Sequence, residues 1–162
     1  MALEKLRAIT AHLLAANLVS SEQLDSWMES GELETASKNL GNGVRICRLR
    51  YDAVISIERF AQPAELLFAL VTAWVQDNDP ERFTLGLPEP DIEIDVINKR
   101  MADVEIKIPF SENVDLVPDA NGAITYLGQQ WSVAVVGADE ADQVAVGDDE
   151  TAPTDKPYVR ED

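Results

Sequence analysis

Apolar and polar side chains alternate through residues 47–58 with one exception, and this pattern limits what the chain can fold into. Successive side chains of a β-strand point to opposite faces, so odd and even positions form two separate rows. A strand with one apolar face predicts an antiparallel sheet that is covered on a single side. We expect this strand to run over residues 44–59, longer than the usual five or six residues. The even row is polar apart from Val54, and the odd row is apolar: Cys47, Leu49, Tyr51, Ala53, Ile55 and Ile57.

A helix is predicted over residues 63–78. Pro63 suits the first helical position, where its missing N–H has no intrahelical partner. Pro80 cannot continue a helix, so the polar run before it ends this one. We expect the apolar stripe of the helix to pack on the odd face of the strand. The stripe consists of Leu66, Leu67, Leu70, Val71 and Trp74.

Two more helices are predicted before the long strand. In the first, apolar residues recur at helical spacing from Ala2 to Ala16. Ser20 and Gln23 then resemble a capping box that opens a short second helix, ended by Gly31. Its apolar stripe would be Leu24, Trp27 and Met28.

Three hairpins are predicted. A weaker extended segment, 32–40, pairs with the long strand through the Gly41-Asn42-Gly43 turn. After a loop at 83–90, alternating segments at 92–96 and 104–108 flank a polar turn. The third hairpin would join 114–117 to 123–127 through Asn121-Gly122. A last edge strand, or a segment that docks on a partner, would hold Trp131, Val133, Val135 and Val136.

These elements predict an α+β fold, an antiparallel or mixed β-sheet with long hairpins packed by two to three helices. Residues 1–136 would form a single domain. Residues 137–162 carry nine acidic and two basic residues, a net charge of −7, and we expect this tail to be disordered in isolation. The net charge of the whole chain is −17, which argues against binding to the DNA backbone because phosphate binding needs clustered cations.

The sequence holds little that resembles a catalytic or metal site. His12 is the single histidine and lies in the first predicted helix, where a structural role is expected. Cys47 falls on the apolar strand face and is expected to act as a small buried hydrophobe. Asp91, Glu93 and Asp95 form a row, but neighbours on one strand face are ~6.6 Å apart and cannot all bind one ion without ligands from elsewhere. A solvated strand face is therefore expected. We therefore predict no enzyme, no cofactor, no metal and no membrane segment.

Several charged residues remain as candidate contacts for assembly. The arginines of the long strand could pair with the Asp91 row across a subunit boundary, or equally within the chain. The polar turn between the strands of the second hairpin is a further candidate. The full set is Arg45, Arg48, Arg50, Asp91, Glu93, Asp95, Asn98, Lys99, Arg100 and Trp131.

The order of these elements resembles the tail completion protein R (GpR) family of contractile-tailed temperate phages. The resemblance covers about residues 3–130. Its most specific parts are the segment LVTAWVQDNDP, which ends at Pro80, and the hairpin over residues 92–116. Neither part is a catalytic signature, and the chain after Trp131 departs from the family's pattern.

The resemblance implies a structural virion protein with a tail-terminator-like fold. Such a protein would complete the tail by capping the head-proximal end of the tail tube as a hexameric ring and by forming the surface for head joining. Its partners would be other copies, tube or sheath proteins, and head or neck connector proteins. DNA would pass through the ring without specific binding, and assembly would take place in the host cytoplasm. The tip at residues 98–102 would dock on the last tail ring. A neck or connector protein of the same region, or an acidic adaptor that mimics DNA, stays open as an alternative.

Overall fold

A computed structural model describes residues 3–134 of the 162-residue chain. The chain forms two compact units, which are described separately. Among the described residues, the first comprises residues 3–38 and Arg45–Val114, and the second comprises Asn39–Val44 and residues 115–134. The elements are α1 (Glu4–Ala15), β1 (Leu24–Asn39), β2 (Val44–Phe60), α2 (Ala64–Asn78), α3 (Arg82–Leu85), β3 (Asp91–Val96), β4 (Ala102–Pro118), β5 (Ile124–Tyr126) and β6 (Gln129–Val133).

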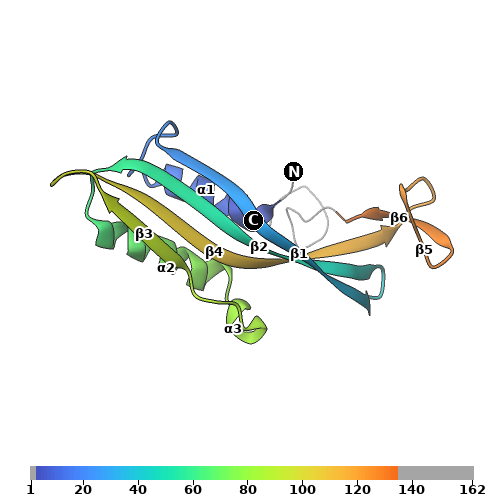
Figure 1. Cartoon of the computed structure of the whole chain (residues 1–162). Coiled ribbons are helices and arrows are strands. Elements are labelled where there is room, and N and C mark those ends of the chain that lie inside the picture. Colours follow the sequence, from blue (N-terminus) through green and yellow to red (C-terminus); the bar gives the residue numbers. More distant parts are fainter. Residues whose placement is uncertain (1–2, 135–162) are drawn as a thin grey trace. The chain divides into compact units, whose positions relative to one another are not determined.

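The first unit is a sheet covered on one face by helices. Its strands are ordered β1-β2-β4, and β3 pairs with β4 as well. Figure 1 shows α1 and α2 on the same side of these strands, so the opposite face carries no helix. This one-sided α+β arrangement is the one predicted from the alternation in the long strand.

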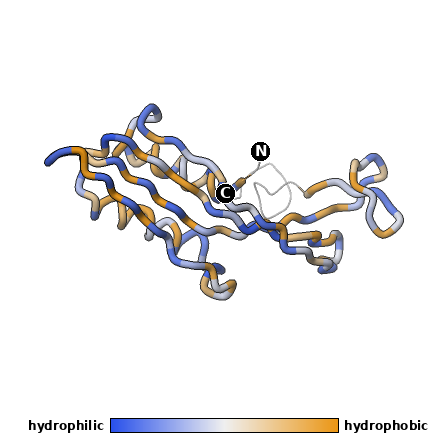
Figure 2. The backbone as a smooth tube through the Cα atoms, viewed as in Figure 1, coloured by the Kyte–Doolittle hydropathy of each residue, from blue (hydrophilic) through white to orange (hydrophobic). Residues whose placement is uncertain are grey.

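The core lies between the helices and the inner face of the sheet. Along β2 the odd row from Tyr51 to Ile57 is buried, and hydropathy alternates residue by residue along the strands in Figure 2. Burying an aliphatic or aromatic side chain of this size contributes about 1.5–3 kcal/mol. The helices and β4 complete the core with Leu6, Ile9, Leu13, Leu67, Val71, Trp74, Val75, Val104, Ile106, Ile108 and Phe110.

The prediction of a second helix is wrong, because the residues of its expected apolar stripe belong to β1. One half of the expected capping box forms, since the Ser20 N–H donates to Oε1 of Gln23 at 3.0 Å. The Gln23 amide, however, donates to the carbonyls of Glu58 and Arg59 at the end of β2. Pairing with β2 thus outweighs the local helix signal. Ser30, with φ of 55°, interrupts the regular geometry of β1.

The loop predicted at 83–90 begins with a single helical turn, α3. Gly86 ends this turn in the left-handed conformation, with φ of 68°. Pro88 and Pro90 follow, so β3 starts only at Asp91. α2 spans the predicted helix except that Pro63 lies just before its first residue. Its buried stripe differs from the prediction, because Leu66 is 45% exposed and Val75 is buried.

The β3–β4 hairpin forms as predicted, but the third predicted hairpin does not. β4 continues past Pro109 to Pro118, so residues 114–117 belong to it. In the second unit β4 pairs with β6, and β6 pairs with β5. Leu127 and Gly128 both have positive φ and make the tight turn between β5 and β6. Trp131 and Val133 therefore lie in a strand, as predicted. This strand, β6, is not an edge strand, because β4 lies on one side of it and β5 on the other.

The Asn121-Gly122 pair has another role in the second unit. Neither residue has positive φ, so the pair does not form the tight hairpin turn that such a pair favours. A Cβ on Gly122 would collide with the backbone carbonyl of Trp131, so this glycine permits a close approach of two backbones. Val135, Val136 and the acidic tail lie outside the described residues.

Candidate assembly surfaces

A catalytic or metal centre is not evident in the part of the chain that the structure describes. Residues 3–134 contain no group of three or more His, Cys, Asp or Glu side chains arranged to hold a metal ion. His12 lies exposed in the last turn of α1, and Cys47 is half-buried on β2. None of the described helices is long and apolar enough to cross a membrane.

The most deeply buried charges join α1, α2, α3 and β4. Nη1 of Arg82 donates to Oδ2 of Asp79 at 2.8 Å and to the carbonyl of Pro109 at 3.1 Å. Its Nη2 donates to the carbonyl of Pro88 at 2.6 Å. Nζ of Lys5 lies 2.7 Å from Oδ1 of Asp79 and forms a second ion pair with this carboxylate. Every partner is a structural group of the first unit, so the cluster fixes the fold and is not a site.

A second polar cluster anchors the start of α1. The carboxylate of Glu112, on β4, accepts hydrogen bonds from the backbone N–H groups of Glu4 and Lys5, both at 3.0 Å. It also accepts a short hydrogen bond from the Tyr51 hydroxyl. Burial is the largest cause that raises the pKa of Tyr51, and the hydrogen bond to the negatively charged Glu112 raises it further. Glu112 thus acts as a helix cap supplied by a distant strand.

Sequence reasoning missed both clusters. In the sequence, Asp79 belongs only to the polar run that ends a helix, and Arg82 lies before the predicted loop at 83–90, outside any predicted element. The i, i+3 spacing of these two residues was the available signal. For Glu112 no local signal exists, because its partners lie 61 to 108 residues away in the sequence.

The arginines of β2 are paired within the chain. Nη1 of Arg48 and Nε of Arg50 each lie 3.8 Å from Oε1 of Glu34 on β1. Nε of Arg48 also donates to Asn113 on β4 at 3.3 Å. Arg45 lies half-buried at the start of β2. These arginines and the Asp91 row are not brought together within one chain.

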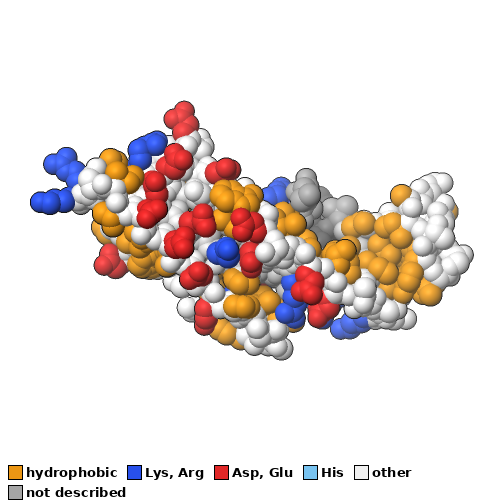
Figure 3. Space-filling model, in the orientation of Figure 1, with side chains coloured by type: hydrophobic (Ala, Val, Ile, Leu, Met, Phe, Trp, Pro, Cys, Tyr) orange, Lys and Arg blue, Asp and Glu red, His pale blue; other side chains and the backbone are white. Residues whose placement is uncertain are grey.

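The carboxylate row is placed on an exposed strand. All six residues of β3 are exposed, and within residues 3–134 the strand pairs with β4 alone. On the sheet face away from the helices, Glu93 lies opposite Glu105, and Asp95 opposite Asp103. Like charges directly opposite each other destabilise a strand pair. Figure 3 shows acidic side chains gathered over this part of the sheet.

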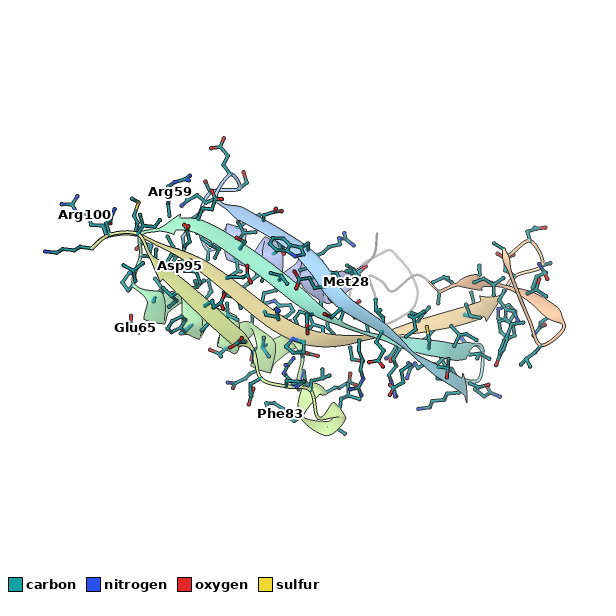
Figure 4. All side chains as sticks on the ribbon, viewed as in Figure 1. Met28, Arg59, Glu65, Phe83, Asp95 and Arg100 are labelled. Atoms are coloured by element: carbon teal, nitrogen blue, oxygen red, sulfur yellow. The ribbon has the colours of Figure 1, made fainter. Side chains whose placement is uncertain are left out.

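The turn between β3 and β4 presents two cations. Oδ1 of Asn98 accepts hydrogen bonds from the backbone N–H of Arg100 at 2.8 Å and of Met101 at 3.0 Å. This bracing holds the turn, so that Lys99 and Arg100 are exposed at its tip, as Figure 4 shows for Arg100. The carboxylate row and this basic tip therefore belong to one hairpin.

Trp131 has a different setting from the other candidates. Its side chain is buried in the second unit, and its indole N–H donates to the carbonyl of Tyr126 at 2.7 Å. The rings of Tyr126 and Trp131 also contact each other, with centroids 6.2 Å apart. Within the described chain Trp131 is thus a packing residue of the small β4–β6–β5 sheet.

Comparison with known proteins identifies the family to which this chain belongs. Residues 3–135 match the family described as P2 phage tail completion protein R (GpR). The chain belongs to the GpR family. It is therefore a phage tail completion protein, a structural component of the virion tail, in a family that is not a known class of enzyme.

A phage relative supports the GpR assignment. The chain is 30% identical over 127 residues to the "uncharacterized 19.2 kDa protein in rep-hol intergenic region" of Haemophilus phage HP1. The match covers 74% of this chain and 76% of the relative. No solved structure matches the chain. As a GpR protein it has other tail components as partners.

Proposed function

We propose that this protein closes the head-proximal end of the tail tube as a ring of identical copies and presents the surface to which the head is joined. The GpR family membership carries the proposal, because it makes the chain a tail completion protein. The fold supports a ring for a separate reason. Among the described residues, β1 of the first unit and β5 of the second unit each have one strand partner, so each leaves a sheet edge open.

A ring needs two different surfaces on each copy that fit one another. Such head-to-tail contacts close only when the rotation between copies completes a circle. The edges of β1 and β5 belong to different strands, as such a contact requires. The resemblance to tail terminators implies a ring of six copies.

The basic tip of the β3–β4 hairpin is the surface proposed to contact the tail tube. Lys99 and Arg100 are exposed, and Asn98 holds the turn that presents them. Two adjacent cations stand out on a chain with a net charge of −17, so they favour an acidic patch on the partner. Sheath proteins and head connector proteins are the further proposed partners.

The net charge also suits a ring around a DNA channel. Phosphate groups are repelled by a surface on which carboxylates dominate, so DNA would pass without specific contacts. Assembly would take place in the host cytoplasm, before the head joins. A neck protein of the same region would share these features, and only its place in the particle differs.

The deciding experiment removes the protein from the phage. Particles assembled without it should show tails of irregular length and heads without tails in electron micrographs. Normal tails of fixed length, fully joined to heads, would contradict the proposal. Native mass spectrometry of the purified protein, alone and with tail tubes, then gives the number of copies in the ring.

Variants test the basic tip. The change Lys99→Ala with Arg100→Ala should reduce binding to isolated tail tubes and leave the fold intact, because both side chains are exposed. The matched control, Arg7→Ala with Lys38→Ala, removes two exposed cations elsewhere. Equal binding by the two double variants would exclude the tip as the tube contact.

A further inference from the structure

We propose that the open edge of β3 accepts an extended basic segment of another protein as an additional strand. The segment would carry Lys or Arg at alternate positions, with apolar residues between them. This inference builds on the proposed function in one respect, since β3 is part of the hairpin offered there for assembly. It names the chemistry of the partner, which the family does not.

The backbone of β3 is available for pairing. Within residues 3–134 its only strand partner is β4, so one side of its peptide groups is unpaired. An extended segment can hydrogen-bond to such an edge through its own main chain. All six residues from Asp91 to Val96 are exposed, and none is covered by a helix or loop.

On the helix side of the sheet, the apolar side chains of β3 continue the core but remain exposed. Ile92 lies opposite Ile106, and Ile94 opposite Val104, so these isoleucines point to the helix side of the sheet. Their partners on β4 are 2–3% exposed, whereas Ile92 is 37% and Ile94 42% exposed. Val96, in the same row, is 76% exposed. A further strand with apolar residues on this side would cover the row.

The other face of β3 lacks cations. Two like-charged pairs, Glu93 with Glu105 and Asp95 with Asp103, lie across the β3–β4 ladder. Lys107, opposite Asp91, is already 3.7 Å from Glu29 on β1. Cations on an added strand would lie beside the carboxylates of β3 and relieve this repulsion.

Charge on a strand edge can also serve only to keep other strands away. A purely protective edge gains nothing from an exposed apolar row on its opposite face, and that row is present here. The combination of acidic and apolar rows instead selects one kind of guest. The acidic row repels strands that carry acidic side chains and attracts strands that carry basic ones. The edge thus gains specificity from both attraction and repulsion.

The guest is not another part of this chain. The two other open edges, β1 and β5, contain a single cation, Lys38, and β1 has four acids of its own. Residues 137–162 have a net charge of −7. Either segment would place acids beside acids, so charge complementarity points to a different protein.

The experiment uses the full-length chain and a synthetic probe, the peptide KVKIKVK with both ends blocked. Nuclear magnetic resonance titration should shift the amide signals of β3, and its amides should exchange more slowly with solvent when the peptide is bound. The peptide KKVVIKK has the same composition without the alternation and should bind about tenfold more weakly, as should the acidic peptide EVEIEVE.

Paired variants separate specific docking from general attraction. The change Asp91→Asn, Glu93→Gln and Asp95→Asn should weaken binding of KVKIKVK about tenfold. The matched control, Asp25→Asn, Glu32→Gln and Glu34→Gln, removes the same charge from β1 and should change binding less than twofold. Ile94→Thr keeps a strand-forming residue but removes the apolar contact, and should weaken binding as well.

Three outcomes would overturn the inference. One is equal binding of the alternating and the rearranged peptide. A second is an equal effect of the β1 and β3 triple variants. The third is self-association of the wild-type chain through β3, seen as protection of β3 amides that grows with protein concentration, since the guest would then be a second copy. Tail capping is tested separately by the micrographs and can hold even if this inference fails.

Discussion

Arg82 donates a hydrogen bond to Asp79 at 2.8 Å, and both side chains are only 2% exposed. A charge pair this deeply buried is stable only while both members are present, because removing one leaves an uncompensated charge without water. The pair also fixes the single turn of α3 against the end of α2.

Asp79→Ala should therefore lower the free energy of unfolding by about 3–5 kcal/mol. The variant leaves the guanidinium of Arg82 without its carboxylate and also removes the partner of Lys5. Urea denaturation followed by circular dichroism measures the change. The control is Glu58→Gln in the exposed Glu58–Arg59 pair, which should cost less than about 1 kcal/mol. Similar losses in the two variants would contradict this account of the buried pair.

Glu112→Ala should destabilise the start of α1 specifically. The change leaves two backbone N–H groups and the Tyr51 hydroxyl without their acceptor, at a cost of about 2 kcal/mol or more. Hydrogen exchange at the amides of Glu4 and Lys5 should become faster than in the wild type. Glu105→Ala changes an exposed carboxylate on the same strand and should leave those rates unchanged.

Tyr51→Phe should alter how stability depends on alkaline pH. The raised pKa means that the folded state retains the phenol proton while the unfolded chain loses it near pH ~10. The associated stability is complete below this pH and then falls by about 1.4 kcal/mol per pH unit as pH rises. The variant lacks this contribution, and below pH ~10 it is less stable by about 1–2 kcal/mol because the bond to Glu112 is lost. Urea denaturation at a series of pH values should show the gap narrowing above pH ~10, and parallel curves would contradict the prediction.

Gly122→Ala should disturb the second unit alone. The added Cβ would collide with the backbone carbonyl of Trp131, so the ladder near that residue must shift, at a cost of more than about 1 kcal/mol. The indole N–H signal of Trp131 reports the change, because that group is bonded to Tyr126. Gly31→Ala is the control, since its Cβ would meet only the flexible end of Met28 at 3.0 Å. A shift of the Trp131 signal in the control, or none in Gly122→Ala, would refute the argument.

Patterns that repeat along the chain predicted most of the fold. The alternation in β2 and in the β3–β4 hairpin marked the strands and their buried faces, because strand side chains keep a period of two. The apolar stripes of α1 and α2 and the glycine turn before β2 were equally local signals. These elements follow from neighbouring residues, so the sequence alone defines them.

The errors arose where distant contacts decide. Leu24, Trp27 and Met28 have helical spacing, yet the hydrogen bonds of Gln23 to the end of β2 hold this segment in a strand. Pairing of β6 between β4 and β5 was likewise set by a turn at residues 127–128 that the sequence does not mark strongly. At the surface, the exposure of the apolar row of β3 could not be predicted, because alternation tells which face is apolar and not whether another layer covers it.

The prolines around β3 give its open edge a defined length. Pro88 and Pro90 precede the strand, and Pro109 stands two residues beyond the end of the β3–β4 ladder on the other strand. At the other end the Asn98 turn closes the hairpin. A guest strand can therefore pair with six residues of β3, a length of about 20 Å, and cannot extend the pairing beyond them. Such a short, bounded track favours a single docking event over the open-ended stacking that produces fibrils.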